Sequence, residues 1–416
     1  MLDIIDDLKY RGLIKDFSDE EKVRELLKTP TTIYCGFDPS ASSVHLGNFV
    51  MISLLMRLQR AGHRVIALVG GGTGMIGDPS GKSKERKFLT ADDVKANTEA
   101  IKNQLSKFID FSDESKGLVV NNYDWYSNLN LLDYLRNVGK FFQVGYMLSK
   151  DIVASRLETG ISLTEFTYMT LQSYDFYHLY KTYDCTLQIG GGDQWGNLTA
   201  GLDYIRKREE DSKAQCMTAN LITKSDGTKF GKSEGGAIYL DEKLTSPYKM
   251  YQFLFNQSDE DAIKYIKIFT FLEKEEIAEI EREHLANLGQ RIGQKRLAYE
   301  VTKIIHGEEK AKEAIKMSEA LFSNNFTELS ASQIEELFGD MKVTADSSLL
   351  LEELLINIKA ASSKRESREF IKNGAVSVNG EKVFEATKTF SKDELLAGKY
   401  LIIKRGKKNY YLVELA

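Results

Sequence analysis

The chain has 416 residues and a formal net charge of −5, and its 42% hydrophobic and 28% charged residues predict two or three folded globular domains. The three cysteines, Cys35, Cys185 and Cys216, are too few and too scattered for a disulfide framework or a zinc site, so reduced cytoplasmic thiols are expected and no bound metal is. No apolar run approaches the ~20 residues of a membrane helix, and the acidic N-terminus lacks the features of a signal peptide, so no membrane partner is expected.

Strand-like and helix-like segments alternate in the first half of the chain. Residues 31–37, 63–71, 117–122 and 185–192 are predicted as strands, and residues 48–62, 90–109 and 162–180 as helices. Thr90 with Asp93, and Ser162 with Glu165, are capping patterns at two of the helix starts. The alternation predicts an α/β fold with a Rossmann-like parallel sheet, whose ligands bind beyond the carboxyl ends of the strands.

The segment IYCGFDPSASSVHLGN, residues 33–48, passes from the first of these strands into a helix. If the helix begins near Gly47, its free N–H groups attract an anion, and His45 and Asn48 supply further donors. Gly36 and Gly47 would let a ligand approach the backbone closely. The alternative is an ordinary loop with a surface histidine.

Two glycine-rich stretches resemble nucleotide-binding patterns that their context excludes. GTGMIG, residues 72–77, has the GxGxxG spacing, but a helix-breaking DPSG follows at once and no second strand ends in an acidic residue ~20 positions on. The two GKS triplets lack the glycine that a P-loop requires. These glycines are therefore expected to line a pocket floor, with Asp78 pointing into it.

The helix predicted at 162–180 carries hydrogen-bonding side chains where a core helix would carry leucines. Tyr168, Gln172 and Asp175 stand at i, i+4 and i+7 on one face. Buried polar groups need partners, so this stripe predicts a ligand site, the alternative being a solvated face. The following strand ends in GGGDQ, where Asp193 and Gln194 are placed to hold a sugar.

Beyond these elements come a lysine-rich loop, a helical region and a basic tail. The loop 224–236 has three lysines and four glycines, which predicts a mobile cationic segment or a plain surface turn. From Pro247 the chain is nearly all helix. Residues 341–416 contain 14 Lys+Arg and 10 Asp+Glu, which is +4 against −9 for the rest, and such asymmetry predicts a separate module that meets an anion.

Taken together, these motifs resemble a known family. HLGN at a strand-to-helix switch, followed by KFGKS, resembles the paired signatures of class I aminoacyl-tRNA synthetases. YCGFDPSASSVHLGN, GGGTGMIGDPSG, YMTLQSYDF and QIGGGDQWGN are similar to bacterial tyrosyl-tRNA synthetases, and the similarity spans essentially the whole chain. The resemblance implies that tyrosine and ATP, with Mg²⁺, form tyrosyl-adenylate and pyrophosphate, and that tyrosine then moves to the terminal ribose of tRNA(Tyr). Such chemistry needs alignment and charge stabilisation rather than a nucleophilic side chain.

The resemblance also implies roles for individual residues. Tyr34 and Asp175 are expected to bracket the phenolic hydroxyl. The substrate ammonium group is expected to meet Asp78, Tyr168, Gln172 and Gln188. ATP is expected to meet Gly36, Asp38, His45, Gly47, Asn48, Asp193, Gln194 and Lys232. Catalytic contacts to the phosphates and ribose are expected from His45, Asn48, Lys82, Arg86, Lys229, Lys232 and Ser233. Asn48 departs from the family, which usually has a second histidine there, and an Asn N–H can donate a similar bond.

The same resemblance implies a domain plan. A catalytic domain is expected at 1–235, with an insertion near 125–160 through which the family forms homodimers; the alternative for the apolar residues of this insertion is plain core packing. An anticodon-binding helical domain is expected at 236–322, a linker at 323–345, and an RNA-binding domain like that of a ribosomal protein at 346–416. Lys364, Arg365, Arg368 and Lys372 lie along one helix of the tail, where phosphate contacts would make binding salt-dependent.

Three rival functions remain open on the sequence. A tryptophanyl-tRNA synthetase shares the architecture. The indole N–H of tryptophan needs only a hydrogen-bond acceptor, whereas Tyr34 and Asp175 together supply a donor and an acceptor, so this pair argues against tryptophan as the substrate. The loss of the second histidine leaves room for an RNA-binding protein that kept the fold without the activity. A third possibility is another nucleotidyl transferase that activates a small carboxylate, which the RNA-type tail disfavours.

Overall fold

The computed structural model describes residues 3–80, 89–158, 160–233 and 236–415. The chain divides into two compact units, Met1–Ile305 and His306–Ala416.

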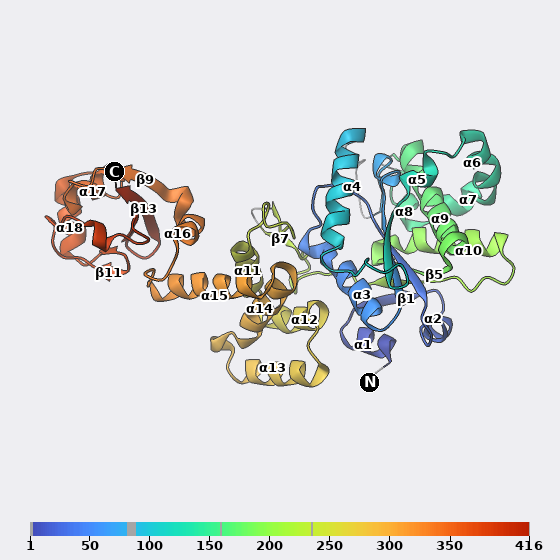
Figure 1. Ribbon diagram of the computed structural model, residues 1–416, viewed down its shortest axis with the longest axis horizontal. Coiled ribbons are helices and arrows are strands. Elements are labelled where there is room, and N and C mark those ends of the chain that lie inside the picture. Colours follow the sequence, from blue (N-terminus) through green and yellow to red (C-terminus); the bar gives the residue numbers. More distant parts are fainter. Residues whose placement is uncertain (1–2, 81–88, 159, 234–235, 416) are drawn as a thin grey trace. The chain divides into compact units, whose positions relative to one another are not determined.

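The first unit is an α/β domain followed by helices (Figure 1). Its strands are β1 Ile14–Phe17, β2 Thr32–Phe37, β3 Arg64–Val69, β4 Gly117–Asn121, β5 Cys185–Gly191, β6 Gln215–Ala219, β7 Lys232–Ser233 and β8 Gly236–Ala237. Its helices are α1 Ile4–Tyr10, α2 Glu20–Leu26, α3 Phe49–Arg60, α4 Ala91–Leu105, α5 Tyr123–Tyr126, α6 Leu131–Asn137, α7 Val144–Leu148, α8 Asp151–Ala154, α9 Leu163–Tyr183, α10 Trp195–Arg208, α11 Pro247–Phe255, α12 Asp259–Phe269, α13 Lys274–Ala286 and α14 Ile292–His306.

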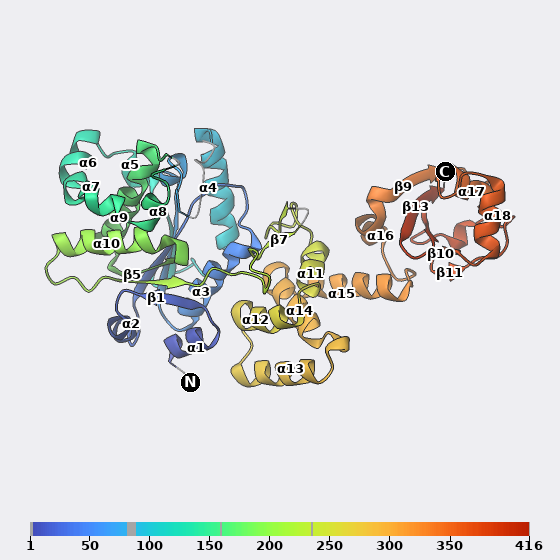
Figure 2. The ribbon, with the colours of Figure 1, turned by 180° about the vertical axis from the view of Figure 1, so that it is seen from behind.

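A six-stranded sheet in the order β1-β6-β5-β2-β3-β4 forms the centre of this unit. All its pairs are parallel except the edge pair β1–β6, which is antiparallel. Helix α4 lies on one side of the sheet and α9 and α10 on the other (Figures 1 and 2). Strand β3 reads RVIALV without alternation because both faces of the sheet are covered. The predicted Rossmann-like α/β fold is confirmed, and the strand order reverses between β2 and β5, where such sheets bind ligands.

The helix starts follow from local sequence signals. Thr90 and Asp93 cap α4 reciprocally, side chain to backbone in both directions, as their spacing predicts. The Ser162 side chain accepts a hydrogen bond from the Glu165 N–H at the start of α9. Glu165 also pairs in the interior with Arg156, at 2.9 Å between Nη2 and Oε2. These contacts fix the first turn of the helix that carries Tyr168, Gln172 and Asp175.

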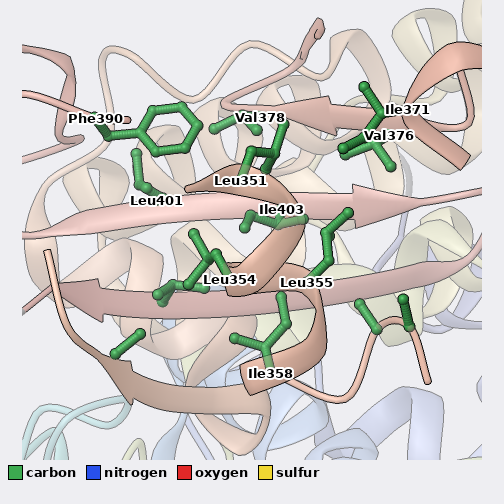
Figure 3. Close-up of a cluster of buried hydrophobic side chains, with 14 residues drawn as sticks. Leu351, Leu354, Leu355, Ile358, Ile371, Val376, Val378, Phe390, Leu401 and Ile403 are labelled. Carbon is green, nitrogen blue, oxygen red and sulfur yellow. The ribbon is translucent and has the colours of Figure 1, made fainter. Parts of the chain in front are cut away.

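The second unit contains a five-stranded sheet in the order β11-β10-β12-β13-β9. Its elements are α15 Glu308–Ser323, α16 Ala331–Phe338, β9 Lys342–Ala345, α17 Leu351–Asn357, α18 Lys364–Lys372, β10 Val376–Val378, β11 Glu381–Lys382, β12 Tyr400–Arg405 and β13 Asn409–Leu415. Side chains from α17, α18 and the sheet, among them Leu354, Ile371 and Ile403, form its apolar core (Figure 3).

The predicted linker at 323–345 differs from the structure. This range contains α16 and the edge strand β9, which pairs in parallel with β13 from Leu412 to Leu415. Phe326 and Phe338 pack edge to face at 5.5 Å, so the segment is folded onto its own unit. The unit boundary falls at 305–306, inside the helical region expected at 236–322, and α15 therefore belongs to the second unit.

Candidate active site

Polar residues follow the carboxyl ends of the central strands. Asp38 comes directly after β2, Thr73 shortly after β3, and Asn122 directly after β4. Asp193 and Gln194 lie in a 3₁₀ turn at the end of β5. Because parallel strands end at one edge of the sheet, these side chains gather where the strand order reverses.

Asp175 is the acceptor of a buried hydrogen-bond cluster on α9. Asn122 Nδ2 donates to its Oδ2 at 3.0 Å, and Trp125 Nε1 and the Tyr126 hydroxyl donate to its Oδ1 at 2.9 and 2.6 Å. Burial raises the pKa of the Asp175 carboxyl to about 7, against the lowering effect of its donors. The cluster therefore fixes the direction of the carboxylate and leaves it close to its titration point at neutral pH.

The three donors to Asp175 were not predicted. Asn122, Trp125 and Tyr126 lie about fifty residues earlier, in the segment NNYDWY at the end of β4 and in α5. The available signal was a strand that ends in two asparagines and is followed by aromatic residues with polar atoms. Their partner could not be read from the spacing, because the pairing depends on the placement of α9 across the sheet.

Tyr34 lies in β2, 1% exposed, with its ring 5.4 Å from that of Phe176. Its hydroxyl has no hydrogen-bond partner among the described residues. Burial, and then the charge of Asp175, raise the pKa of Tyr34 well above its ordinary value, so the hydroxyl stays protonated and lies within the field of that carboxylate. A buried hydroxyl without a partner is costly, and a ligand hydroxyl next to Asp175 would remove that cost.

Tyr168 links the helix stripe to the end of β2. Its hydroxyl donates to Asp38 Oδ2 at 2.8 Å, and Thr73 Oγ1 donates to Asp38 Oδ1 at 2.8 Å. Burial raises the pKa of Tyr168, and the charges of Asp38, Asp78 and Asp175 raise it further. Three carboxylates thus act on one buried hydroxyl, an environment that attracts an ammonium group. Asp38, predicted on the ATP side, is placed here among the predicted amino-acid residues.

Asp78 lies in a second polar group. Gln194 Nε2 donates to its Oδ2 at 2.7 Å, and Asn197 Nδ2 donates to Gln194 Oε1 at 3.1 Å. The Oε1 atoms of Gln172 and Gln188 are buried and have no hydrogen-bond partner among the described residues. Gln188 stands directly opposite Tyr34 on β5. Asp78 acts on Tyr168 through its charge, and Gln172 and Gln188 leave buried acceptors that a ligand can use.

The glycines around this site have two different uses. At Gly70, a Cβ would stand 2.1 Å from Asp38 Oδ1 and 2.3 Å from Thr73 Oγ1, so the absence of a side chain allows the polar contacts to form. At Gly36, exposed near the carboxyl end of β2, a Cβ would meet nothing within 4 Å. Gly36 therefore leaves open space beside the sheet, as a ligand-facing position requires.

The two signature segments pack against each other through their backbones. His45 forms a bridge with Tyr239, and the Leu46 N–H donates to the Ile238 carbonyl at 2.7 Å. A Cβ at Gly231, where φ is +85°, would stand 2.5 Å from the Gly47 nitrogen. This contact requires glycine on both sides and holds HLGN beside KFGKS.

Those of the predicted phosphate-binding groups that the structure describes lie in the segments that form this junction. Asn48 is exposed, and as the residue before α3 it makes no side-chain capping hydrogen bond. Lys229 and Lys232 are exposed, and Lys232 pairs with Ala237 in the two-stranded sheet β7–β8, which also contains Ser233. Lys82 and Arg86 lie outside the described residues.

The four cations predicted to bind RNA all lie on α18. Lys364 pairs with Glu353 at 2.8 Å and Arg368 with the buried Glu352 at 2.9 Å, whereas no ion pair joins Arg365 or Lys372 to another described residue.

Within the described ranges, no helix is long and apolar enough to cross a membrane, and no group of three or more His, Cys, Asp and Glu residues is suited to a metal ion.

Comparison with known proteins gives full-length matches. A family profile described as class I tRNA synthetases (W and Y) matches residues 26–323, and one described as the tyrosine--tRNA ligase SYY-like C-terminal domain matches residues 333–413. Tyrosine--tRNA ligase 1 of Bacillus anthracis is 53% identical over 415 residues, 99% of each chain. Tyrosine--tRNA ligase 1 of Bacillus subtilis (strain 168) is 50% identical over 419 residues, again 99% of each. A C-terminally truncated mitochondrial tyrosyl-tRNA synthetase of Aspergillus nidulans superposes with a TM-score of 0.69 at 30% identity, covering 77% of this chain and 95% of that one.

Proposed function

The chain belongs to the class I tRNA synthetases as a tyrosine--tRNA ligase, and from this premise we propose that the polar site at the end of its sheet forms tyrosyl-adenylate. A carboxylate oxygen of tyrosine attacks the α-phosphorus of ATP, and the bond to pyrophosphate breaks. The tyrosyl group then passes to the 3′-terminal ribose of tRNA(Tyr). The observation that carries this site assignment is the buried hydroxyl of Tyr34, which lacks a partner among the described residues and lies in the field of Asp175.

On the tyrosine side, the substrate phenol donates to Asp175 and accepts from Tyr34. Asn122, Trp125 and Tyr126 act as positioning residues, because their three bonds fix the carboxylate that receives the phenol. The substrate ammonium group binds where Asp78, Tyr168 and Gln172 converge, with Gln188 behind them and Asp38 supplying further negative charge.

On the ATP side, Gly36, Asp193 and Gln194 receive the adenosine and ribose. His45 and Asn48 donate to the phosphates and ribose. Lys229, Lys232 and Ser233, with Lys82 and Arg86 from the facing loop, bind the β- and γ-phosphates and stabilise the charge that develops on pyrophosphate. Mg²⁺ arrives with ATP as part of the substrate.

Tyrosine binding is expected to depend on the ionisation of Asp175. Its pKa of about 7 lies above the ordinary value of 3.8, so the folded state holds this proton more tightly than the unfolded chain. Ionisation of this group therefore lowers the free energy of unfolding as pH rises from 3.8 to about 7. The hydrogen bond from the substrate phenol needs the ionised carboxylate, which prevails above pH 7. We expect the tyrosine dissociation constant, measured by titration calorimetry without ATP, to rise by up to ~10-fold per pH unit below that pKa.

The matched variant is Asp175→Asn, which keeps the shape and cannot titrate. Its weaker tyrosine binding should be flat over the same pH range. A wild-type dissociation constant that does not change between pH 6 and pH 8, roughly a unit either side of the pKa, would contradict the assignment.

We propose that the helices from α11 to α14 bind the anticodon side of tRNA, and that α18 of the second unit contacts its phosphates. Arg365 and Lys372 are expected to contribute most, because Lys364 and Arg368 are held by carboxylates. Replacing Arg365 and Lys372 together by alanine should lower the slope of log K for tRNA against log salt by ~0.7–0.9 for each lost contact.

The matched control for this RNA measurement is Arg368→Ala. It leaves the buried Glu352 without its partner, so its main effect should be on the melting temperature rather than on the salt slope. If the salt slope is the same for the wild type and the Arg365/Lys372 variant, α18 does not contact the phosphates.

We propose that the insertion near 125–160 forms a homodimer interface. Large apolar side chains are exposed there and at the start of α9: Leu131 at 68%, Leu132 at 72%, Leu135 at 54%, Val144 at 61% and Leu163 at 76%. A concentration of exposed large apolar side chains in one segment is typical of an interface. Light scattering at micromolar concentration should give twice the 47.1 kDa chain mass.

Replacing Leu132 and Leu135 by aspartate should give the mass of one chain, whereas Leu285→Asp, at a similarly exposed leucine of α13, should leave the dimer intact. A wild-type mass of 47.1 kDa would rule out a stable dimer.

For the location of the chain we propose the cytoplasm, which suits three cysteines that are free and buried.

A further inference from the structure

The lysine-rich loop includes a hairpin, in which backbone hydrogen bonds join residues 222–224 to residues 228–230. The Phe230 N–H donates to the Ile222 carbonyl at 3.1 Å, Thr223 bridges to Lys229, and the Lys224 N–H donates to the Thr228 carbonyl at 2.8 Å. Lys229 therefore stands directly across the hairpin from Thr223. Lys232 lies two residues beyond Phe230, which ends the second side of the hairpin.

Helix α12 holds the opposite strand of this hairpin. Asp261, 2% exposed, accepts the Ser225 N–H at 3.0 Å on Oδ1 and the Ser225 hydroxyl at 3.1 Å on Oδ2. One turn further, Lys264 Nζ and the Tyr265 hydroxyl both donate to the Thr223 carbonyl, at 2.6 and 3.1 Å. A nearly buried carboxylate with charge-assisted bonds to a loop backbone is a strong local anchor.

The closing strand of the hairpin is held by the same helix through its side chain. Phe230, 3% exposed, lies 4.3 Å from the ring of Tyr265 and 5.1 Å from that of Phe269, measured between centroids. Phe230 is the residue between Lys229 and Gly231. Both sides of the hairpin stem are thus attached to α12, one by polar bonds and one by aromatic packing.

The other end of α12 is attached to the sheet domain. Arg11 and Arg57, both buried, donate to the carbonyl oxygens that follow the last turn: Arg11 Nη2 to Leu272 at 2.9 Å, and Nη2 of Arg57 to Thr270. Arg57 belongs to α3, the helix that starts directly after Asn48. Helix α12 therefore connects the lysine hairpin to the helix that carries the HLGN turn.

From these contacts we infer that Asp261 is a positioning residue for adenylate formation, which acts by fixing the hairpin from which Lys229 and Lys232 reach the phosphates of ATP. The inference rests on the proposed role of those lysines. Asp261 itself does not touch a substrate. Its effect passes through Ser225 and the hairpin, so it should change the use of ATP and not the binding of tyrosine.

The test is tyrosine-dependent pyrophosphate exchange with Asp261→Asn, in the full-length protein. Loss of the charged bonds to Ser225 should lower kcat by about tenfold to a hundredfold and raise KM for ATP, with the tyrosine dissociation constant within about twofold of wild type. Ser225→Ala, which keeps the backbone bond and removes the hydroxyl, should show a smaller change in the same direction. Glu260→Gln, at the exposed neighbouring position in the same turn, should match wild type.

Combination with Lys229→Ala/Lys232→Ala separates positioning from a general structural role. If Asp261 acts through the lysines, adding Asp261→Asn to that double variant should change kcat by less than about twofold. Additive losses, or an Asp261→Asn loss that weakens tyrosine binding to the same extent, would overturn the inference. If the lysine double variant is as active as wild type, the proposed lysine role fails instead. Should Asp261→Asn not fold, an unchanged kcat and KM in Ser225→Ala would count against the inference.

Discussion

Lys232→Ala is expected to lower kcat for tyrosine-dependent exchange of pyrophosphate into ATP by roughly a hundredfold to a thousandfold, the usual cost of losing a group that stabilises transition-state charge. The side chain is exposed, on a short strand held beside HLGN through Gly231 and Gly47. It is proposed to meet the phosphates as pyrophosphate leaves, so the rate should fall while the tyrosine dissociation constant stays within about twofold.

The matched control for Lys232 is Lys243→Ala, which removes the same charge from an exposed position beyond the loop. It should leave the exchange rate unchanged. An exchange rate for Lys232→Ala equal to wild type would refute the proposed role of this lysine, as would an equal loss in both variants.

Asp175→Ala is expected to abolish most of the preference for tyrosine over phenylalanine. With Asp175 present, a bound phenylalanine leaves a buried carboxylate and the Tyr34 hydroxyl without their ligand partner, each at a cost of ~1–3 kcal/mol, and more for the charged group. Without Asp175, bound phenylalanine no longer leaves a buried carboxylate without its ligand partner. Bound tyrosine loses the hydrogen bond from its phenol to that carboxylate. The ratio of kcat/KM for tyrosine to that for phenylalanine should fall by about a hundredfold or more.

Tyr34→Phe is the graded comparison for the selectivity measurement, because it removes a neutral hydroxyl and keeps the ring packed against Phe176. Its selectivity loss should be smaller than that of Asp175→Ala. If Asp175→Ala retains the wild-type ratio, the phenol does not bind at this carboxylate.

Much of the sheet domain could be predicted from the sequence because its signals are local. The capping residues Thr90 and Asp93 stand three positions apart at the start of α4, and the unbroken apolar run of β3 indicates a strand covered on both faces. The stripe of Tyr168, Gln172 and Asp175 follows from helical spacing alone. These features lie within one helix or one strand, where neighbouring residues determine the outcome.

The contacts that escaped prediction join distant segments. Trp125 reaches Asp175 across fifty positions and the Tyr168 hydroxyl reaches Asp38 across 130, because both pairings are decided by how α9 crosses the sheet. Strand β9 was expected to be part of a linker, since its four residues KVTA form a strand only by pairing with β13 at the far end of the chain. Short edge strands of this kind carry little periodicity of their own.

The most direct test of the whole account is pyrophosphate exchange into ATP by the wild-type protein, with tyrosine, phenylalanine and tryptophan compared at equal concentration. Exchange should be fast with tyrosine and slower by orders of magnitude with phenylalanine, whose ring cannot satisfy Tyr34 and Asp175, and with tryptophan, whose indole offers only a donor. Exchange of similar rate with all three amino acids, or none with tyrosine, would contradict it.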